Sequence, residues 1–151
     1  MQTLIEENDV TAVNLSVELE RVVIAHTLDD DKSIYVTESD FFPFWVKLNE
    51  DAHLVIFSSY TLFTHASSRL ERLELCNSLN YSQYMLTVSV RENKMVFDHA
   101  LSFRDGLLRE NLIRSMRMFS TNIIKGLSRF DPDHTIALLP GTEESTSTDQ
   151  E

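Results

Sequence analysis

The residues that could carry chemistry in this sequence do not have the spacing of a metal-binding site. Asp29, Asp30 and Asp31 are clustered carboxylates that suit calcium or magnesium, but the run lacks the alternate spacing, the glycine and the distant glutamate of an EF-hand loop. The five histidines and the single cysteine, Cys76, lack the short ligand spacing of zinc sites. We therefore expect a solvated turn at residues 29–31, and neither a metal ion nor a cofactor.

Motifs for nucleophilic catalysis and phosphate binding are also missing from the sequence. No GxSxG segment occurs, and Ser58-Ser59 fall inside a strand-like pattern rather than at a strand-to-helix turn. The three glycines are too far apart to form a phosphate-binding loop. Carboxylate pairs such as Glu50-Asp51 lie in turns where water screens them. We expect no catalytic residues, and thus a protein that is not an enzyme.

The composition indicates one cytoplasmic domain. A chain of 151 residues can bury a real core but is short for two domains. The single cysteine excludes an internal disulfide and fits a reducing compartment. No segment resembles a signal peptide, and no run of about 18 apolar residues could span a bilayer. We expect no membrane partner.

The acidic charge is concentrated at the two ends of the chain. The formal net charge is −11, yet residues 32–142 contain equal numbers of acidic and basic residues. Residues 1–31 carry eight acids and one base, and residues 143–151 carry four acids and no base. Phosphate binding requires clustered Lys and Arg, so this charge balance argues against a nucleic-acid partner.

Two apolar runs within residues 41–63 organise the rest of the chain. They predict two strands around the polar turn Asn49-Glu50-Asp51, and they hold half of the aromatic residues. Because side chains alternate along a strand, each run has two faces, and both faces of both runs are largely apolar. An antiparallel sheet usually leaves one face polar. A second polypeptide is therefore the expected cover for one face.

Helical and strand periodicities predict the remaining elements. The predicted helices begin near Ser16, near Ser67 or Ser68 with Glu71 completing a capping box, and near residue 107. The first helix should stop at residues 29–31, the second at Asn80 as its C-terminal cap, and the last at Asp131-Pro132. Further strands are expected at residues 33–37, 84–90 and 94–103. The predicted order is α-β-β-β-α-β-β-α, an α+β fold with a five-stranded antiparallel sheet and helices packed on it.

This prediction divides the chain into three parts. Residues 1–12 should be a loosely ordered N-terminal segment, residues 13–141 a single domain, and residues 142–151 a disordered acidic tail. The last helix is basic, with five Arg and Lys residues against Glu110 alone: Arg109, Arg114, Arg117, Lys125 and Arg129. A solvated helix face explains this pattern most simply. The alternatives are docking of an acidic peptide and pairing with the acidic N-terminal region.

The element order and two short segments resemble the YbjN family of small bacterial proteins labelled sensory transduction regulators. The segments are residues 75–80, LCNSLN, before a strand hairpin, and residues 105–108, DGLL, at the start of the last helix. The resemblance covers about residues 16–139. That family is similar in fold to the type III secretion chaperones, which are acidic, usually dimeric and non-catalytic. The resemblance therefore implies a protein-binding module and a homodimer.

The apolar strands are also the expected protein-interaction site. Leaving a large apolar side chain in water forgoes roughly 1.5–3 kcal/mol, and an exposed patch of such side chains usually marks an interaction surface. The residues predicted to form this surface are Phe41, Trp45, Val55 and Phe57. The alternative is that a terminal segment, residues 4–5 or residues 136–139, folds over them.

The sequence thus predicts a non-enzymatic protein-binding module, a YbjN-like regulator or adaptor whose protein partner it does not identify. The closest alternative is a type III secretion-type chaperone that holds an extended client segment. A chaperone should co-purify with an unfolded segment of one client, whereas an adaptor should bind a folded partner.

Overall fold

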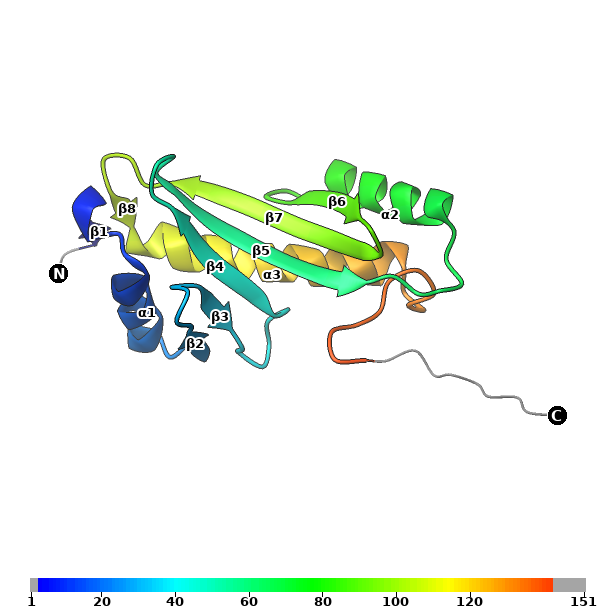
Figure 1. Ribbon diagram of the computed structural model, residues 1–151, viewed down its shortest axis with the longest axis horizontal. Helices are drawn as coiled ribbons and strands as arrows, with labels where there is room; N and C mark the ends of the chain where they lie inside the picture. The colour runs from blue at the N-terminus through cyan, green and yellow to red at the C-terminus, as the bar shows by residue number, and fades with distance from the viewer. Residues whose placement is uncertain (1–2, 143–151) are drawn as a thin grey trace.

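A six-stranded antiparallel sheet with one long helix against one face forms the centre of the molecule, as shown by a computed structural model that describes residues 3–142 (Figure 1). In their order across the sheet the strands are β2 (His26–Leu28), β3 (Ile34–Val36), β4 (Phe44–Asn49), β5 (Leu54–Leu62), β7 (Lys94–Ser102) and β6 (Thr87–Arg91). A separate two-stranded pair joins β1 (Leu4–Ile5) to β8 (Leu107–Leu108). The predicted α+β class is confirmed, with six strands in the main sheet rather than five.

The helices lie on one side of this sheet or at its ends. They are α1 (Ala12–Arg21), α2 (Arg69–Ser82) and α3 (Arg109–Phe130), with a short 3-10 helix at Glu7–Asp9. Figure 1 shows α3 behind the sheet along β5 and β7, α1 near one end and α2 beside β6 at the other. No helix of the described residues crosses in front of the sheet in this view. One sheet face is therefore covered and the other is left open.

The apolar stripe of α3 forms the core with the covered face. Its buried residues recur every three or four positions, as predicted, and include Leu112, Met116, Phe119, Ile123 and Leu127. The ring of Phe119 lies 5.2 Å from that of Phe44 and 5.7 Å from that of Phe57. Such ring pairs contribute beyond the area that they bury, so this cluster fixes α3 on the sheet.

The start of α2 follows the sequence prediction. Ser68 is the N-cap: its Oγ accepts a hydrogen bond from the Glu71 N–H at 3.1 Å, and Glu71 Oε2 accepts one from the Ser68 N–H at 2.6 Å. This reciprocal capping box satisfies two backbone donors at the helix start. The helix continues past the predicted end at Asn80 and finishes at Ser82.

Asn80 has a different role from the predicted cap. Its side-chain amide donates to the Val88 carbonyl at 2.8 Å and its side-chain oxygen accepts from the Val88 N–H at 2.7 Å. Val88 belongs to β6, which lies at one edge of the sheet. The side chain therefore satisfies backbone groups that an edge strand would otherwise leave open to another strand.

The first helix is shorter than predicted and begins earlier. Thr11, rather than Ser16, is its N-cap, with Oγ1 accepting from the Asn14 N–H at 3.2 Å. The helix ends at Arg21, before the β-branched run Val22-Val23-Ile24, and Val23 has a positive φ of 59°. Because β-branched residues lose side-chain freedom in a helix, the chain turns there. Residues 26–28, predicted as helix, instead form β2 and make the sixth strand.

The N-terminal segment is more ordered than expected. Leu4 and Ile5 pair with Leu108 and Leu107, and both Ile5 and Val10 are buried. Gly106 permits this approach with a φ of 104°, because a Cβ there would lie 2.9 Å from the Ile5 carbonyl oxygen. Residues 3–12 are thus attached to the domain. Residues 143–151, which include nearly all of the predicted acidic tail, lie outside the described part of the chain.

A buried carboxylate turns the chain back after α3. Asp131 accepts hydrogen bonds from the backbone N–H groups of Thr135 at 2.9 Å, of Ile136, and of Ala137 at 2.8 Å. The segment that follows runs beside the end of β5: Ala137 bridges Phe63, and the Leu138 N–H donates to the Leu62 carbonyl at 2.8 Å. The predicted end of α3 at Asp131-Pro132 agrees with this turn within one residue.

We predict that Gly126→Ala lowers the free energy of unfolding by about 1–3 kcal/mol. A Cβ at Gly126 would lie 2.3 Å from Leu79 Cδ2, and Leu79 is fully buried, so α2 and α3 would have to separate. Alanine is intrinsically the better helix former by about 1 kcal/mol, so the clash must exceed that gain. Urea unfolding measures the difference. Thr121→Ala, at an exposed position of α3, is the control and should have little effect.

We also predict that Asn80→Ala lowers the free energy of unfolding by about 1 kcal/mol, because it leaves both Val88 backbone groups without the amide partner. Asn77→Ala is the matched control, since Asn77 is an exposed residue of the same helix. Thermal or urea unfolding of the two variants should therefore separate them. Equal stability of both variants would show that the Asn80 hydrogen bonds contribute nothing.

Candidate functional site

The structure separates the four residues predicted to form the interaction surface. Phe41 and Trp45 are partly exposed, whereas Val55 and Phe57 are 0% exposed. The strand register explains the difference: Trp45 pairs with Ser58 and Val46 pairs with Phe57, so Trp45 and Phe57 point to opposite faces. Val55 and Phe57 belong to the core beneath α3, and grouping them with Trp45 on one face is wrong.

The side of the sheet away from α3, called here the open face, carries a row of aromatic side chains. Trp45 stacks on Tyr35 with ring centroids 4.7 Å apart and on Tyr60 at 5.8 Å. The Lys94 ammonium lies 4.6 Å from the centre of the Tyr60 ring, a cation–π contact. Tyr60 is 44% exposed and Leu62 is 40% exposed. The open face is completed by Ile56 and Val96, both partly exposed.

Exposure alternates strictly along β5, which shows the sidedness of the sheet. Residues with odd numbers from 55 to 61 are buried, and those with even numbers from 54 to 62 are at least partly exposed. An antiparallel sheet with helices on one side has this pattern. The side chains that reach water on β5 are more apolar than this pattern usually gives, because they include Ile56, Tyr60 and Leu62.

The C-terminal segment borders the open face without sealing it. Residues 138–142 line a cavity of about 230 Å³ together with Tyr35, Trp45, Tyr60 and other residues near them. The hydroxyl of Thr61 also donates to the Leu138 carbonyl. Of the two segments considered as covers, residues 136–139 thus lie at one border, whereas residues 4–5 pair with β8. Tyr60 and Leu62 remain exposed.

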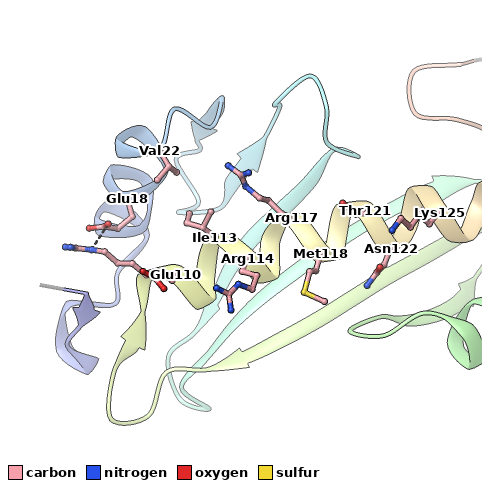
Figure 2. Close-up of a pocket in the computed structure, with 11 residues that line it drawn as sticks. Glu18, Val22, Glu110, Ile113, Arg114, Arg117, Met118, Thr121, Asn122 and Lys125 are labelled. Atoms are coloured by element: carbon pink, nitrogen blue, oxygen red, sulfur yellow. Dashed lines mark ion pairs between the residues drawn. The ribbon is translucent and has the colours of Figure 1, made fainter. Parts of the chain in front are cut away.

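A second surface, called here the α3 groove, lies on the outer side of α3 (Figure 2). It has a volume of about 600 Å³ and runs along α3 to the end of α1. Its apolar side chains are Val22, Ile113 and Met118, and its rim carries Arg114, Arg117 and Lys125. Figure 2 shows these α3 side chains projecting from the helix, with Glu18 coming from α1 and Val22 being the residue that follows α1.

An ion-pair network closes one end of this groove. Glu18 of α1 is buried, with its Oε2 atom 2.7 Å from Arg109 Nε and its Oε1 atom 3.0 Å from Arg21 Nη1. At Arg109 the network matches one of the two alternatives considered for the basic helix, pairing with the acidic N-terminal region, rather than the solvated face that explained the pattern most simply. Within residues 3–142, Arg114, Arg117 and Lys125 form no ion pair, so their charges remain available at the rim.

Reactive groups in the described residues are few and scattered. Burial raises the pKa of the Cys76 thiol to about 11, so the thiol is neutral and unreactive at physiological pH. No three His, Cys, Asp or Glu side chains of residues 3–142 come together in a way that could hold a metal ion. At residues 29–31, the Asp31 carboxylate accepts from the Ser33 N–H at 3.0 Å, an interaction local to the turn. No described helix has the length and low polarity needed to cross a membrane.

Comparison with known proteins identifies the family. A family model described as "Putative bacterial sensory transduction regulator", named YbjN, matches residues 9–131. This chain belongs to the YbjN family. The match confirms the family predicted from residues 75–80 and 105–108, and the family description is that of a regulator.

Solved structures with this fold are distant in sequence. The crystal structure of YbjN from E. coli, described as a putative transcription regulator, has a TM-score of 0.67 and 14% identity, over 83% of this chain and 94% of that one. An uncharacterized protein from Methanothermobacter thermautotrophicus has a TM-score of 0.60 and 12% identity, over 80% and 96% of the two chains. No curated protein sequence matches the chain. At these identities the likeness to the two structures shows the fold alone.

Sequence reasoning missed Tyr35, Tyr60 and Leu62 as members of the surface that contains Trp45. For Tyr35 the missing information was the register of β3 with β4, and for Tyr60 and Leu62 it was the length of the turn between β4 and β5. Asn49 pairs with Leu54, so four residues form the turn, and His53 adopts a φ of 54° there. The Asn49 side chain accepts from the Ala52 N–H at 3.1 Å, an interaction typical of asparagine in turns. Asn49 was therefore the residue in the sequence that could have indicated where this turn begins.

We predict that His99 makes the protein less stable at mildly acidic pH. His99 lies on the covered face, with its ring 6.1 Å from that of Phe57, and burial lowers its pKa below the ordinary value. The unfolded chain, with a histidine pKa of about 6.5, then binds the proton more readily than the folded chain. The free energy of unfolding is fully retained above that value and falls as the pH drops through the folded pKa.

The measurement is urea unfolding of the parent protein and His99→Gln at several pH values between 7 and 5. The parent should lose stability more steeply than the variant as the pH falls. Equal slopes for the two proteins would contradict a destabilising protonation of His99. Circular dichroism at pH 7 shows whether the variant is folded.

Proposed function

We propose that this protein is a non-enzymatic adaptor of the YbjN family that binds protein through its open face. The observation that carries the proposal is the aromatic row Tyr35, Trp45 and Tyr60, which lies on a sheet face that no helix of residues 3–142 covers and has Leu62 exposed beside it. Exposed apolar side chains of this size usually mark an interaction surface in soluble proteins. Tyrosine and tryptophan are also the residue types most enriched at the centres of protein interfaces.

A second copy of the chain is the partner proposed first. The open face has an apolar centre and carries charges of both signs, with Lys47 and Lys94 on β4 and β7 and Asp98 near the middle of β7. A two-fold interface places the same patch on both subunits, so such a face can match itself without collecting like charges. A homodimer through this face would bury the aromatic row that the single chain leaves partly in water.

The alternative, a chaperone that holds an extended client, depends on how the client would bind. Strand addition at the β6 edge is obstructed, because Asn80 already occupies the Val88 N–H and carbonyl. At the other edge, β2 has three residues, which is short for a client strand. An extended client would therefore have to rest across the open face through side-chain contacts. These edges favour an adaptor with a folded partner over a chaperone.

We predict that the parent protein is a dimer and that Leu62→Glu converts it to a monomer. Leu62 is on the open face and partly exposed, so glutamate should be tolerated in the single chain but not in the interface. The matched control is Leu70→Glu, because Leu70 is 64% exposed on α2, away from the open face. Size-exclusion chromatography with light scattering at several concentrations measures the molecular mass of each.

A monomeric parent at all concentrations, or a dimer that Leu70→Glu disrupts as strongly as Leu62→Glu, would refute self-association through the open face. Trp45→Ala extends the test, since Trp45 stacks on both neighbouring tyrosines. Phe57→Glu serves as a core variant instead of a surface variant, because it would bury a charge beneath α3 and unfold the chain.

The same variants distinguish an adaptor from a chaperone once a bound protein is recovered from cells. Proteolysis of the complex decides: a folded partner resists digestion, whereas an unfolded client segment is protected only where it touches the chain. Either kind of partner should be lost from Leu62→Glu and retained by Leu70→Glu. Retention by both variants would contradict binding at the open face.

A further inference from the structure

The α3 groove is a basic and apolar surface on a strongly acidic protein. We propose that it binds an acidic amphipathic helix from a protein partner, at a site separate from the open face. The groove lies on the outer side of α3, whereas the open face is on the far side of the sheet (Figures 1 and 2). The proposal therefore adds a second binding surface and does not depend on the first.

The size and apolar content of the groove suit a helix. The α3 residues that line it extend from position 109 to position 125, which corresponds to roughly 24 Å along a helix axis. Ile113, Met118 and Val22 supply the apolar contacts, and Met118 and Val22 are exposed in the single chain. Helix-in-groove recognition uses such a stripe to bury apolar residues spaced three and four apart on the incoming helix.

The charges at the rim select an acidic partner. Arg114, Arg117 and Lys125 have no ion-pair partner within residues 3–142, whereas Glu18 is engaged by Arg21 and Arg109. The groove is therefore lined by these three cations and one further acid, Glu110, on a chain whose formal net charge is −11. Carboxylates that flank the apolar stripe of an incoming helix would pair with these cations, and complementary charges of this kind give specificity and faster association.

The end of α1 supplies one of the apolar side chains of the groove. Val23 has a φ of 59° and is 84% exposed, although a β-branched side chain in the left-handed region is strained. Its neighbour Val22 lines the groove. Here the turn at Val23 ends α1 and leaves Val22 beside the groove.

Other occupants fit less well. A second copy would bring the basic rim of one chain against the basic rim of the other, and these like charges would repel. The C-terminal segment of the described chain is not the occupant either, because its last residue, Thr142, lies beside Trp45 on the open face and does not line the α3 groove. Nucleic acid would have to approach a protein of net charge −11 and would place phosphates on an apolar floor. An acidic amphipathic helix would place apolar side chains on the floor of the groove and carboxylates beside its basic rim.

The test uses the full chain and three synthetic peptides of about 16 residues with blocked ends. The first is a helical peptide with leucines at helical spacing and glutamates beside them. The second has the same composition in scrambled order, and the third replaces the glutamates with lysines. NMR spectra of the isotope-labelled protein are recorded during titration with each peptide. The expected result is binding of the first peptide alone, with shifts concentrated on α3 and the end of α1.

Charge reversal identifies the site. Arg114→Glu/Arg117→Glu should weaken binding of the acidic helical peptide at least tenfold. The matched control is Arg69→Glu/Arg91→Glu, which reverses two exposed arginines on α2 and β6 and should leave the affinity unchanged. Added salt should weaken the binding, because the rim charges are exposed. Leu62→Glu on the open face should bind the peptide like the parent, which separates this proposal from the proposed function.

Four outcomes would overturn the proposal. They are no binding of the acidic helical peptide, equal binding of the scrambled peptide, unchanged binding after Arg114→Glu/Arg117→Glu, and tighter binding of a short DNA duplex that depends on the same two arginines. The last outcome would assign the groove to nucleic acid. A folded circular dichroism spectrum of each double variant is required before its affinity is compared, and Met118→Ala provides a second, uncharged variant that should weaken peptide binding.

Discussion

Contact between α3 and one face of the sheet determines the rest of this structure. Phe119 packs against both Phe44 and Phe57, and further hydrogen bonds attach the chain near that contact. The Phe42 N–H donates to Ser120 Oγ of α3 at 2.8 Å, and Ser59 Oγ donates to the Pro43 carbonyl at 2.5 Å. A single long helix can cover one face of a sheet but not both. The open face is a direct consequence of this geometry.

The same contact also orients the charges of the molecule. The buried stripe of α3 faces the sheet, so its arginines and lysine must lie on the outer side or near the ends. Glu18 neutralises one end of this basic surface through Arg109. The protein thus has an apolar aromatic surface on one side and a basic groove on the other, with α3 and the sheet between them.

Much of the fold could be predicted because the structure of a long periodic segment depends on residues that are close together in the sequence. The stripe on α3 and the capping box at Ser68 are examples, and both depend on residues within one or two helical turns. The end of α1 could not be predicted from periodicity, because the helical spacing continues past Arg21 through Leu19, Val22 and His26. There the β-branched residues and the pairing of His26–Leu28 with β3 outweighed the periodicity.

The candidate site was harder to predict because it depends on register. A three-residue turn after Leu48 would pair Trp45 with Val55 and place both on one face. The actual turn has four residues, so Trp45 pairs with Ser58 and shares its face with Tyr60. The two registers differ by three residues, and a shift by any odd number of residues moves a whole set of side chains to the other face. Turn length therefore decides which aromatic residues reach solvent.

The edges of the sheet explain why we expect a partner to bind to a face of the molecule and not to an edge strand. Asn80 occupies the backbone of β6, and β2 is three residues long, so neither edge offers a long free strand. The binding proposed for the open face would depend on side chains such as Tyr60 and Leu62, which can change without disturbing the core beneath α3. The fold is retained at 14% identity to E. coli YbjN, with a TM-score of 0.67. A fold retained at this identity allows different exposed residues, so the partner proposed for this protein must be sought through the exposed residues of this chain itself.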